Sequence, residues 1–500
     1  MSMPAERMTT APTLAALLDG FATAPALPVH GIASDSRRLE AGDLFLAVQG
    51  LTSHGLDFIA EATRAGAVAI AWDATTGSKP ADTEIPTIAV PDLAGKLGEI
   101  ANRFYGRPSE RLDVIGITGT NGKTTVAWMI AQAAEFVGEH CGYLGTLGYG
   151  VGEVVNANGM TTPPVVELHH RLAGFVDAGA ASAAIEVSSH ALAQRRVDGV
   201  RFDTALFTNI SRDHLDYHAD MREYFESKAR LFTDYDPKHR VISIDSDYGM
   251  QLAALFGTDV VTVSTHFDRV ANGRPYLFVR AVVATEHGSD ISFISSWGSG
   301  SFSLRLPGDF NVANAALVLA LLLLKGVAFE QACDVMSQLE APPGRMQRVA
   351  TAGPAVFVDY AHTPLALECA LRALRAHCRG RVWCVFGCGG DRDRGKRPQM
   401  GKAAERQSDR LVITTDNPRG EDPSAIMDDI VAGLVHPEQA TIIEDRAAAI
   451  AWAIDGAAEH DVVLVAGKGH EAYQEAQGVR TAFSDYAVAQ AALAAKEGSQ

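Results

Sequence analysis

The sequence has few cysteines and no excess of basic residues, and each shortage excludes a class of protein. The six cysteines, at positions 141, 333, 369, 378, 384 and 388, are scattered and form no CxxC pair. Neither a zinc knuckle nor a disulfide scaffold is therefore expected, and a reduced, cytoplasmic setting fits this pattern. The formal net charge of −17 argues against binding to nucleic acid, although local basic groups can still hold small anions.

Long apolar runs are also missing. The longest, AALVLALLLL at 315–324, is too short for a bilayer, which needs about 20 residues, so it predicts a buried core helix. The first fourteen residues show no charged stretch followed by an apolar run, so no signal peptide is expected. We expect a monomer that does not insert into a membrane.

Two stretches rich in proline and glycine divide the chain. With 500 residues, the chain is long enough for about three domains. The stretches lie at 106–110 and 340–344, where such punctuation marks turns and boundaries. The predicted domains are therefore 1–109, 110–343 and 344–500.

Strands and helices alternate in all three segments. The predicted strands are 43–48, 67–71, 112–118, 181–187, 203–208, 355–358, 382–386, 410–415 and 461–466. The predicted helices are 56–65, 123–136 and 221–232. This alternation predicts an α/β protein with mostly parallel sheets covered by helices.

In the last segment, a polar cluster follows each of the four predicted strands. These clusters are 359–362, 387–392, 416–419 and 467–471. Because ligands of open α/β sheets bind beyond the carboxyl ends of the strands, the clusters predict one binding site at that edge. The alternative is a set of ordinary polar loops.

A glycine-rich loop joins the strand at 112–118 to the helix at 123–136. Its sequence, GITGTNGKTT at 116–125, places backbone N–H groups at a helix N-terminus, where they can bind phosphate. Lys123 would neutralise the β- and γ-phosphate oxygens, and Thr124 would offer its hydroxyl to Mg²⁺. The general GxxxxGK[ST] spacing fails because Ile117 occupies its first glycine position. The alternative is a glycine turn without a ligand.

TGTNGKTT resembles the P-loop of the Mur ligases and of their folylpolyglutamate synthetase relatives, and the resemblance extends over nearly the whole chain. It implies a UDP-binding N-terminal domain, a central ATPase domain and a C-terminal Rossmann-like domain that receives an amino acid. The resemblance implies these ATP contacts: Gly119, Thr120, Asn121, Gly122, Lys123, Thr124, Thr125, Asn314, Arg345 and Asp359.

Two further motifs resemble magnesium ligands of this family. Glu186 ends a predicted strand within EVSSH, and an acidic group there is well placed to hold Mg²⁺. His214 lies in NISRDHLD at 209–216, and the resemblance implies that it binds a second Mg²⁺. Since histidine is an unusual magnesium ligand, the residues alone favour a structural or acid–base histidine.

Helical spacing places Lys228 on an apolar face with Tyr224, Phe225, Leu231 and Phe232. One interpretation is snorkelling, in which the ammonium reaches water. However, burial lowers a lysine pKa, and a neutral amine can react with CO₂. The resemblance implies a carbamylated lysine here, which would supply oxygen ligands to Mg²⁺.

The resemblance also implies contacts with a nucleotide sugar. Ser36, within Asp35-Ser36-Arg37, matches the uridine-binding entry. The implied contacts with the muramoyl peptide are Thr161, Thr162, Ser188, Gln194 and Arg196. Many relatives have asparagine where this chain has Met160, so that contact differs.

Arg419 closes the sequence DNPR at a strand end, where Pro418 stiffens the turn. An arginine fork binds carboxylate with two parallel hydrogen bonds, so Arg419 predicts selection of meso-diaminopimelate over L-lysine. The other implied contacts of this amino acid are Arg392, Asp416, Asn417, Pro418, Gly467 and Glu471. The alternative is a tight turn with a surface arginine.

The implied activity is ATP- and Mg²⁺-dependent ligation of meso-2,6-diaminopimelate to UDP-N-acetylmuramoyl-L-Ala-D-Glu through an acyl phosphate, in peptidoglycan precursor synthesis. Alternatives within the family are a lysine-adding homologue, a D-Ala-D-Ala-adding ligase and folylpolyglutamate synthetase. An alternative from another class is a P-loop regulatory protein that hydrolyses nothing.

Overall fold

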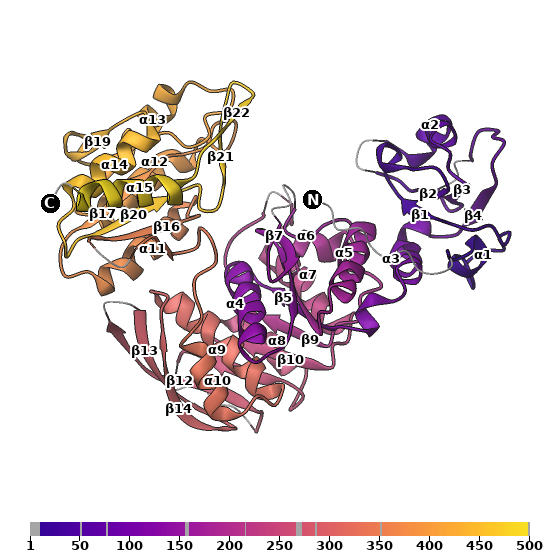
Figure 1. Cartoon of the computed structure of the whole chain (residues 1–500), viewed down its shortest axis with the longest axis horizontal. Coiled ribbons are helices and arrows are strands. Elements are labelled where there is room, and N and C mark those ends of the chain that lie inside the picture. The colour runs from indigo at the N-terminus through magenta and orange to yellow at the C-terminus, as the bar shows by residue number, and fades with distance from the viewer. Residues whose placement is uncertain are drawn as a thin grey trace. The chain divides into compact units, whose positions relative to one another are not determined.

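The computed structural model describes residues 11–50, 53–76, 79–155, 160–215, 217–266, 273–285, 288–350 and 353–498 (Figure 1). The first ten residues and Asp216 lie outside these ranges. The expectation about a signal peptide concerns the first of these segments. The chain forms two compact units, Met1–Val261 and Thr262–Gln500. The predicted divisions at 109/110 and 343/344 remain predictions.

The first unit opens with a four-stranded parallel sheet in the order β1-β2-β3-β4. Its strands are β1 (Gly31–Ala33), β2 (Asp43–Ala47), β3 (Ala69–Asp73) and β4 (Thr87–Val90). Apolar residues alternate along β2 and β3. One set packs on α1 (Leu14–Leu17) and α3 (Leu93–Phe104), and the other on α2 (Ile59–Arg64). The predicted helix 56–65 is a short 3₁₀ turn followed by α2.

Six strands of a ten-stranded sheet lie in this unit, in the order β10-β9-β5-β8-β6-β7. They are β5 (Asp113–Thr118), β6 (Cys141–Gly145), β7 (Gly148–Val151), β8 (Ser182–Glu186), β9 (Thr204–Phe207) and β10 (His239–Ser243). All pairs among them are parallel except β6–β7, which a short turn joins. The helices are α4 (Lys123–Phe136), α5 (Val165–Asp177), α6 (Ser189–Ala193), α7 (Met221–Thr233) and α8 (Asp247–Ala254).

The second unit contains an antiparallel meander, which the sequence pattern did not predict. β11 (Val261–Ser264) pairs parallel with β12 (Tyr276–Thr285), but β12, β13 (Gly288–Ser295) and β14 (Gly298–Leu304) pair antiparallel. Only two residues separate β12 from β13 and β13 from β14, and such short connections cannot join parallel neighbours.

The apolar run at 315–324 forms the buried part of α9 (Asp309–Leu324), which confirms the predicted core helix, and α10 (Phe329–Met336) follows it. No helix in the described ranges combines the length and the apolar character needed to cross a membrane.

The C-terminal sheet has the order β15-β16-β20-β17-β18-β19, and only β15 is antiparallel. Its strands are β15 (Gln347–Arg348), β16 (Ala355–Asp359), β17 (Val382–Phe386), β18 (Arg410–Ile413), β19 (Thr441–Ile442) and β20 (Val462–Ala466). One face packs on α11 (Pro364–His377), α12 (Lys396–Gln407) and α13 (Pro423–Val431), and the other on α14 (Arg446–Gly456) and α15 (Asp485–Glu497). The predicted α/β class is confirmed.

A separate two-stranded hairpin, β21 (Tyr473–Ala476) and β22 (Val479–Ala482), follows β20 and precedes α15 (Figure 1). The sequence pattern did not predict this hairpin. Its position matters for the site described next.

Candidate functional site

The loop between β5 and α4 has the backbone shape of a phosphate-binding loop. Gly119 and Gly122 adopt φ values of 149° and 88°, a region that favours glycine. A Cβ on Gly119 would lie 1.9 Å from Thr208 Oγ1, so no other residue fits there. The Lys123 ammonium donates to the carbonyls of Gly119 and Thr120, at 2.8 and 2.9 Å. The loop thus places a cation and a helix N-terminus together, which suits phosphate.

The residues after β9 hold this loop in place. Asn209 accepts from the Asn121 N–H at 3.1 Å and donates to the Asn121 carbonyl at 3.1 Å. Thr208 also donates to that carbonyl, at 2.6 Å. The motif that begins at Asn209 therefore fixes the conformation of the P-loop from a neighbouring strand.

The buried carboxylate of Glu186, at the end of β8, accepts hydrogen bonds from several directions. Its Oε2 accepts from Thr124 Oγ1 at 2.9 Å and from Thr146 Oγ1 at 3.2 Å. Its Oε1 accepts from Tyr143 OH at 2.7 Å and from the Thr146 N–H at 2.9 Å. Thr124 and Glu186 thus present adjacent oxygens, the ligand type that Mg²⁺ prefers.

Lys228 points inward from α7, and its residue exposure is only 1%. The amine donates to the Gly119 carbonyl at 2.8 Å and lies 4.5 Å from the centre of the Tyr224 ring. Burial, followed by the nearby charge of Lys123, moves the pKa of Lys228 well below its ordinary value. The snorkelling interpretation is therefore wrong, and the apolar face predicted from helical spacing is confirmed for Tyr224.

An aromatic and histidine cluster lies next to Lys228. His214, with φ of 52°, has its ring centre 4.9 Å from that of His190 and 6.0 Å from that of Tyr224. The buried His218 bonds Ser189 Oγ through Nε2 at 3.0 Å. The sequence analysis selected only His214. His190 ends the EVSSH motif, and His218 follows the NISRDHLD motif by two residues.

The predicted muramoyl-peptide contacts gather near the end of β8. Thr162 Oγ1 donates to the Glu186 carbonyl at 2.7 Å, and Arg196 donates to the Thr162 carbonyl at 3.1 Å. Ser188 accepts from the Ala191 N–H at 3.1 Å and caps α6. The remaining members bond to neighbouring side chains: Thr161 to Thr146, and Gln194 to Arg196 and Tyr217.

Ser36, the predicted uridine contact, lies apart in the sequence from the predicted muramoyl-peptide contacts. It begins the 3₁₀ helix Ser36–Arg38, is buried, and donates to Glu61 Oε2 at 3.1 Å. Met160, the residue that differs from many relatives, is 52% exposed.

In the second unit, the polar clusters after four strands meet at one edge of the C-terminal sheet, as predicted. The Gly467 N–H donates to the Asp359 carbonyl at 3.1 Å, which connects β20 and β16. Arg419 donates to the Gly390 carbonyl at 2.7 Å, which connects the ends of β18 and β17. The prediction that these polar groups gather at one edge of the sheet is therefore confirmed.

The centre of this cluster is a buried cation that the sequence analysis did not select. Lys468 is 0% exposed and donates to Asn417 Oδ1 at 2.9 Å and to Glu471 Oε2 at 3.1 Å. Asn417 Nδ2 donates to the same Glu471 oxygen at 2.7 Å. Lys468 lies within the cluster 467–471, so the signal was present in the sequence.

The remaining residues predicted to contact the amino acid are Asp416, Pro418 and Arg392. Asp416 Oδ1 accepts from the Asn417 N–H at 2.6 Å, and Pro418 is buried in the turn. A Cβ on Gly467, whose φ is 114°, would approach Asp416 Oδ2 to 2.6 Å. Arg392, by contrast, is exposed on its loop.

The predicted ATP contacts of the second unit occupy two places. Asp359 accepts from the N–H groups of Met346 and Ala361, at 2.7 and 2.8 Å, and burial raises its pKa. Arg345 lies 4.4 Å from the centre of the Tyr360 ring. Asn314 is buried in α9 and donates to Asn311 Oδ1 at 3.3 Å.

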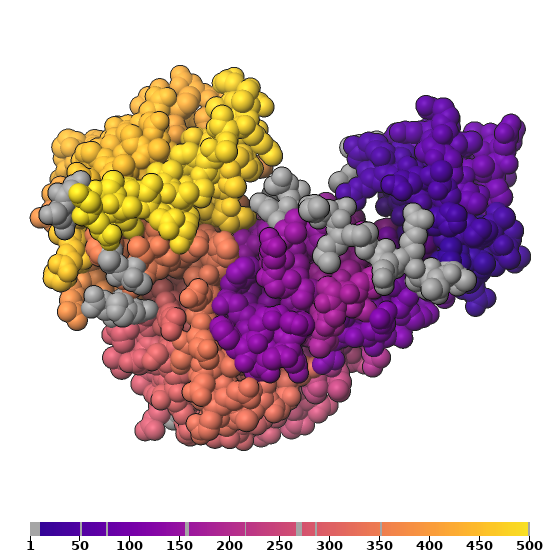
Figure 2. Space-filling view, viewed as in Figure 1, coloured from indigo at the N-terminus to yellow at the C-terminus, as the bar shows by residue number. Residues whose placement is uncertain are grey.

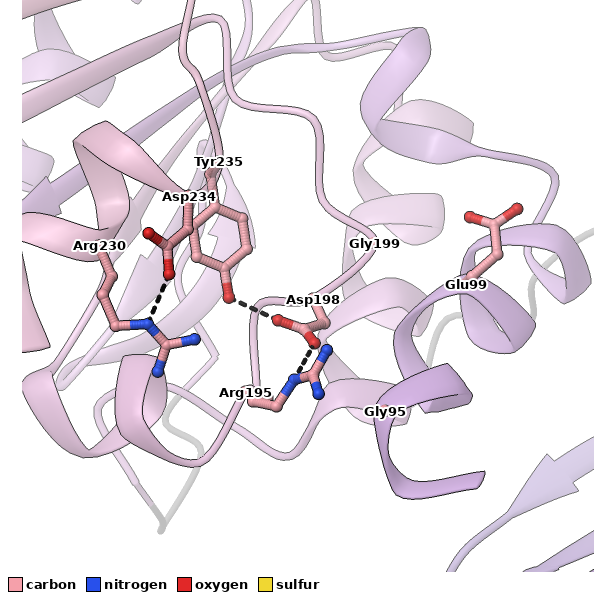
Figure 3. Close-up of a pocket in the computed structure, with 8 residues that line it drawn as sticks. All are labelled: Gly95, Glu99, Arg195, Asp198, Gly199, Arg230, Asp234 and Tyr235. Carbon is pink, nitrogen blue, oxygen red and sulfur yellow. Dashed lines mark hydrogen bonds and ion pairs between the residues drawn. The ribbon is translucent and has the colours of Figure 1, made fainter. Parts of the chain in front are cut away.

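A pocket of about 450 Å³ in the first unit contains none of these residues (Figure 3). It is lined by Gly95, Glu99, Arg195, Asp198, Gly199, Arg230, Asp234 and Tyr235. Its charges largely pair with each other: Arg195 contacts Asp198 at 2.6 Å, and Arg230 contacts Asp234 at 2.8 Å. This pocket is therefore separate from the P-loop and from the sheet edge, where the predicted site residues lie.

Comparison with protein families gives three matches along the chain. The Mur ligase family catalytic domain matches residues 28–105, the Mur ligase middle domain matches 117–322, and the Mur ligase glutamate ligase domain matches 344–469. The chain belongs to the Mur ligase family.

Several Mur ligases are similar over nearly the full length. UDP-N-acetylmuramoyl-L-alanyl-D-glutamate–2,6-diaminopimelate ligase of Chromobacterium violaceum is 45% identical, covering 94% of this chain and 95% of the relative. The protein of the same name from Xanthomonas campestris pv. campestris is 44% identical, covering 98% and 99%.

A solved structure with that name has a TM-score of 0.73 and 32% identity, covering 97% of this chain and 99% of that one. MurF from Acinetobacter baumannii has a TM-score of 0.64 at 18% identity, covering 91% and 95%, and so supports the fold alone.

Proposed function

We propose that this Mur ligase joins meso-2,6-diaminopimelate to UDP-N-acetylmuramoyl-L-Ala-D-Glu with ATP. The observation that carries the proposal is the arrangement at the sheet edge, where Arg419 is anchored on the Gly390 carbonyl beside the Lys468–Glu471 pair. Diaminopimelate differs from L-lysine by one distal carboxylate, and a positioned guanidinium fork is the group that recognises it. Glu471 would bind the distal ammonium, and the names of the similar Mur ligases agree with this substrate.

Activation of the carboxylate would occur at the P-loop. The D-glutamate carboxylate of the nucleotide substrate attacks the γ-phosphorus of ATP, and the bond to ADP breaks. The amine of diaminopimelate then attacks the acyl phosphate carbonyl, loses a proton and expels phosphate. Lys123 and the N–H groups at the start of α4 would stabilise charge on the transferring phosphoryl group.

The oxygens of Thr124 and Glu186 fit a magnesium ion, because both are buried and lie 2.9 Å apart. Across the described ranges, no three His, Cys, Asp or Glu side chains cluster as a metal site, so phosphate oxygens would complete the ligand set. When bound, Mg²⁺ would supply charge neutralisation on the phosphates. We assign His214 and Lys228 to a second ion, with Lys228 acting as a carbamate.

The amine of Lys228 favours that modification. It is buried, and its lowered pKa increases the neutral fraction, which is the form that attacks CO₂. Addition of CO₂ to the neutral amine, with loss of one proton from its nitrogen, would give a carbamate anion with two oxygen ligands. The carbamate is therefore consistent with the otherwise costly burial of this lysine.

The proposed nucleotide-sugar contacts are Ser36 for the uridine and the group around Thr162 and Arg196 for the muramoyl peptide. We further propose that the enzyme works in the cytoplasm as a monomer. The reduced cysteines agree with this, because all six are free in the structure.

Phosphate release is the direct test. The purified enzyme is given ATP, Mg²⁺ and the UDP-dipeptide, and then meso-diaminopimelate, L-lysine, D-Ala-D-Ala or L-glutamate in turn. Release only with diaminopimelate is expected. Release with L-lysine at a similar rate would favour the lysine-adding homologue, and release with none would favour a P-loop protein that is not a ligase.

A further inference from the structure

The β21–β22 hairpin forms a sheet of its own beside the proposed amino-acid site. Its strands pair from Tyr473↔Ala482 to Ala476↔Val479, and the turn residues Gln477 and Gly478 have φ values of 50° and 75°. Two positive φ values are what a type I′ hairpin requires. Strand β22 is exposed along its whole length, within the yellow surface of Figure 2.

The inner strand contacts the DNPR turn residue by residue. Gln474 donates from Nε2 to Thr415 Oγ1 at 2.9 Å and to the Asp416 carbonyl at 2.8 Å. The Glu475 N–H donates to Asn417 Oδ1 at 2.9 Å. Two consecutive residues of β21 thus hold three consecutive residues of the turn.

The hairpin also holds the backbone of Arg419 on both sides. The Arg419 N–H donates to the Glu475 carbonyl at 2.9 Å, and the Gln477 N–H donates to the Arg419 carbonyl at 2.5 Å. Arg419 has φ of 51°, a left-handed conformation that is unfavourable for a non-glycine residue. The two hydrogen bonds stabilise this conformation, which sets the direction in which the side chain leaves the backbone.

We propose that the β21–β22 hairpin is a specificity-determining brace, and that Gln474 is its principal positioning residue. The brace presets the turn 415–419 so that the Arg419 fork meets the distal carboxylate without rearrangement. Such preorganisation matters because small misplacements of a binding group cost affinity steeply. This inference rests on the proposed function, since the selectivity concerned is that for diaminopimelate over L-lysine.

The test compares Gln474→Ala with Thr481→Ala in the full-length enzyme. Thr481 pairs with Gln474 across the hairpin but lies on the exposed outer strand, so the second variant controls for changes in the hairpin itself. Three sets of measurements are made: KM and kcat for diaminopimelate and for L-lysine, the KM for ATP, and amide hydrogen exchange in a peptide covering 415–419 without ligands.

In Gln474→Ala, we expect the KM for diaminopimelate to rise about tenfold. The kcat and the KM for ATP should stay nearly unchanged. Selectivity over L-lysine should fall by a similar factor, and amides at 415–419 should exchange faster than in wild type. Thr481→Ala should match wild type. Unchanged exchange at 415–419, or equal losses for both amino acids, would overturn the brace.

The two proposals can fail separately. If the wild-type enzyme uses L-lysine as well as diaminopimelate, the proposed function fails, whereas the exchange comparison still decides whether the hairpin braces the turn. If wild type is selective but Gln474→Ala keeps both its selectivity and its exchange rates, only the brace fails.

Discussion

The P-loop and the sheet edge of the second unit are built from different kinds of contact. At the P-loop, glycine backbone, short hydroxyls and carbonyls make the shape, and even Lys123 bonds to loop carbonyls. At the sheet edge, long charged side chains bond to one another, as in the buried contact of Lys468 with Glu471. The P-loop itself is one short segment that Thr208 and Asn209 hold in place, whereas the sheet edge is built from residues brought together from four strand ends and a hairpin.

This difference predicts different consequences of mutation. We propose that the side chains at the P-loop serve catalysis more than folding, so their loss should lower activity in a folded protein. We propose that the buried ionic groups of the second unit serve both stability and selectivity, so their loss should affect both. The following experiments test that distinction.

The largest effect is expected from Lys123→Met. Loss of the cation that faces the phosphates should lower kcat about 10³-fold, because charge stabilisation dominates phosphoryl transfer. The thermal midpoint should stay close to that of wild type. Phosphate release and a melting curve measure the two quantities.

Lys238→Met is the matched control for Lys123→Met, since the side chain of Lys238 is 70% exposed and belongs to no proposed site. It should leave kcat unchanged. If Lys123→Met kept near-normal turnover, the catalytic assignment of the P-loop lysine would be wrong.

Arg446→Met should have its main effect on stability. Arg446 forms an ion pair with Asp485 at 2.7 Å, both side chains are 0% exposed, and Arg446 also donates to the carbonyls of Thr415 and Ala466. Removing the arginine leaves a buried carboxylate unpaired, which should cost about 3–5 kcal/mol of unfolding free energy. Denaturant unfolding of the second unit measures this loss.

The double variant Arg446→Met with Asp485→Leu should recover much of that stability, because no unpaired charge remains buried. It should not restore the KM for diaminopimelate, since the carbonyls at the ends of β18 and β20 remain without the guanidinium. Equal stability of the single and double variants would contradict this account.

Replacement of Lys228 should separate stability from activity. Lys228→Ala should lower kcat about 10²-fold, and short carboxylates such as formate should restore part of it by supplying the missing oxygens. Lys228→Met should melt at a higher temperature than wild type, because burying an amine is costly and a thioether fills the same space. Near-normal turnover of Lys228→Ala would exclude the carbamate.

A smaller, pH-dependent effect is expected from His470. Burial, together with the charge of Arg345, lowers the pKa of His470 from 6.5 to about 4. Between these values the unfolded chain binds the proton and the folded protein does not, so stability falls as the pH falls. From pH 7 to pH 5, this histidine should cost about 2 kcal/mol.

His470→Gln should remove that part of the pH dependence, which is measured as the difference from wild type in unfolding experiments at pH 7 and pH 5. The difference isolates His470 from other groups, including His362, whose pKa burial also lowers. Identical pH dependence in both proteins would contradict the burial of His470.

The sequence predicted the P-loop, the strand Asp113–Thr118 and the helix Lys123–Phe136 well, because each depends on neighbouring residues. Helical spacing also placed Lys228 on a buried face. The resemblance, rather than spacing, selected Ser36 and His214. Gln474 and Arg446 were not selected, because their partners lie up to 59 residues away in the sequence. Lys468 was not selected although it lies within the predicted polar cluster 467–471.

The meander β12–β14 shows the other limit of sequence reasoning. Alternating strands and helices in 110–343 predicted a mostly parallel sheet, which holds for β5 and its neighbours. The meander has short loops instead of helices between strands, and its direction follows from those loops. The alternation of strands and helices around β5 therefore did not continue into the meander β12–β14.

The most direct test of the central claim is the ratio of kcat/KM for meso-diaminopimelate to that for L-lysine, in wild type and in Arg419→Ala. With L-lysine, Arg419 would lose its carboxylate partner, and a site built around such a group can reject the analogue by roughly 10⁴-fold. We therefore expect a ratio of about that size in wild type and a collapse toward unity in Arg419→Ala. Equal use of both amino acids by wild type would contradict the substrate assignment, and an unchanged ratio in Arg419→Ala would contradict the role of Arg419.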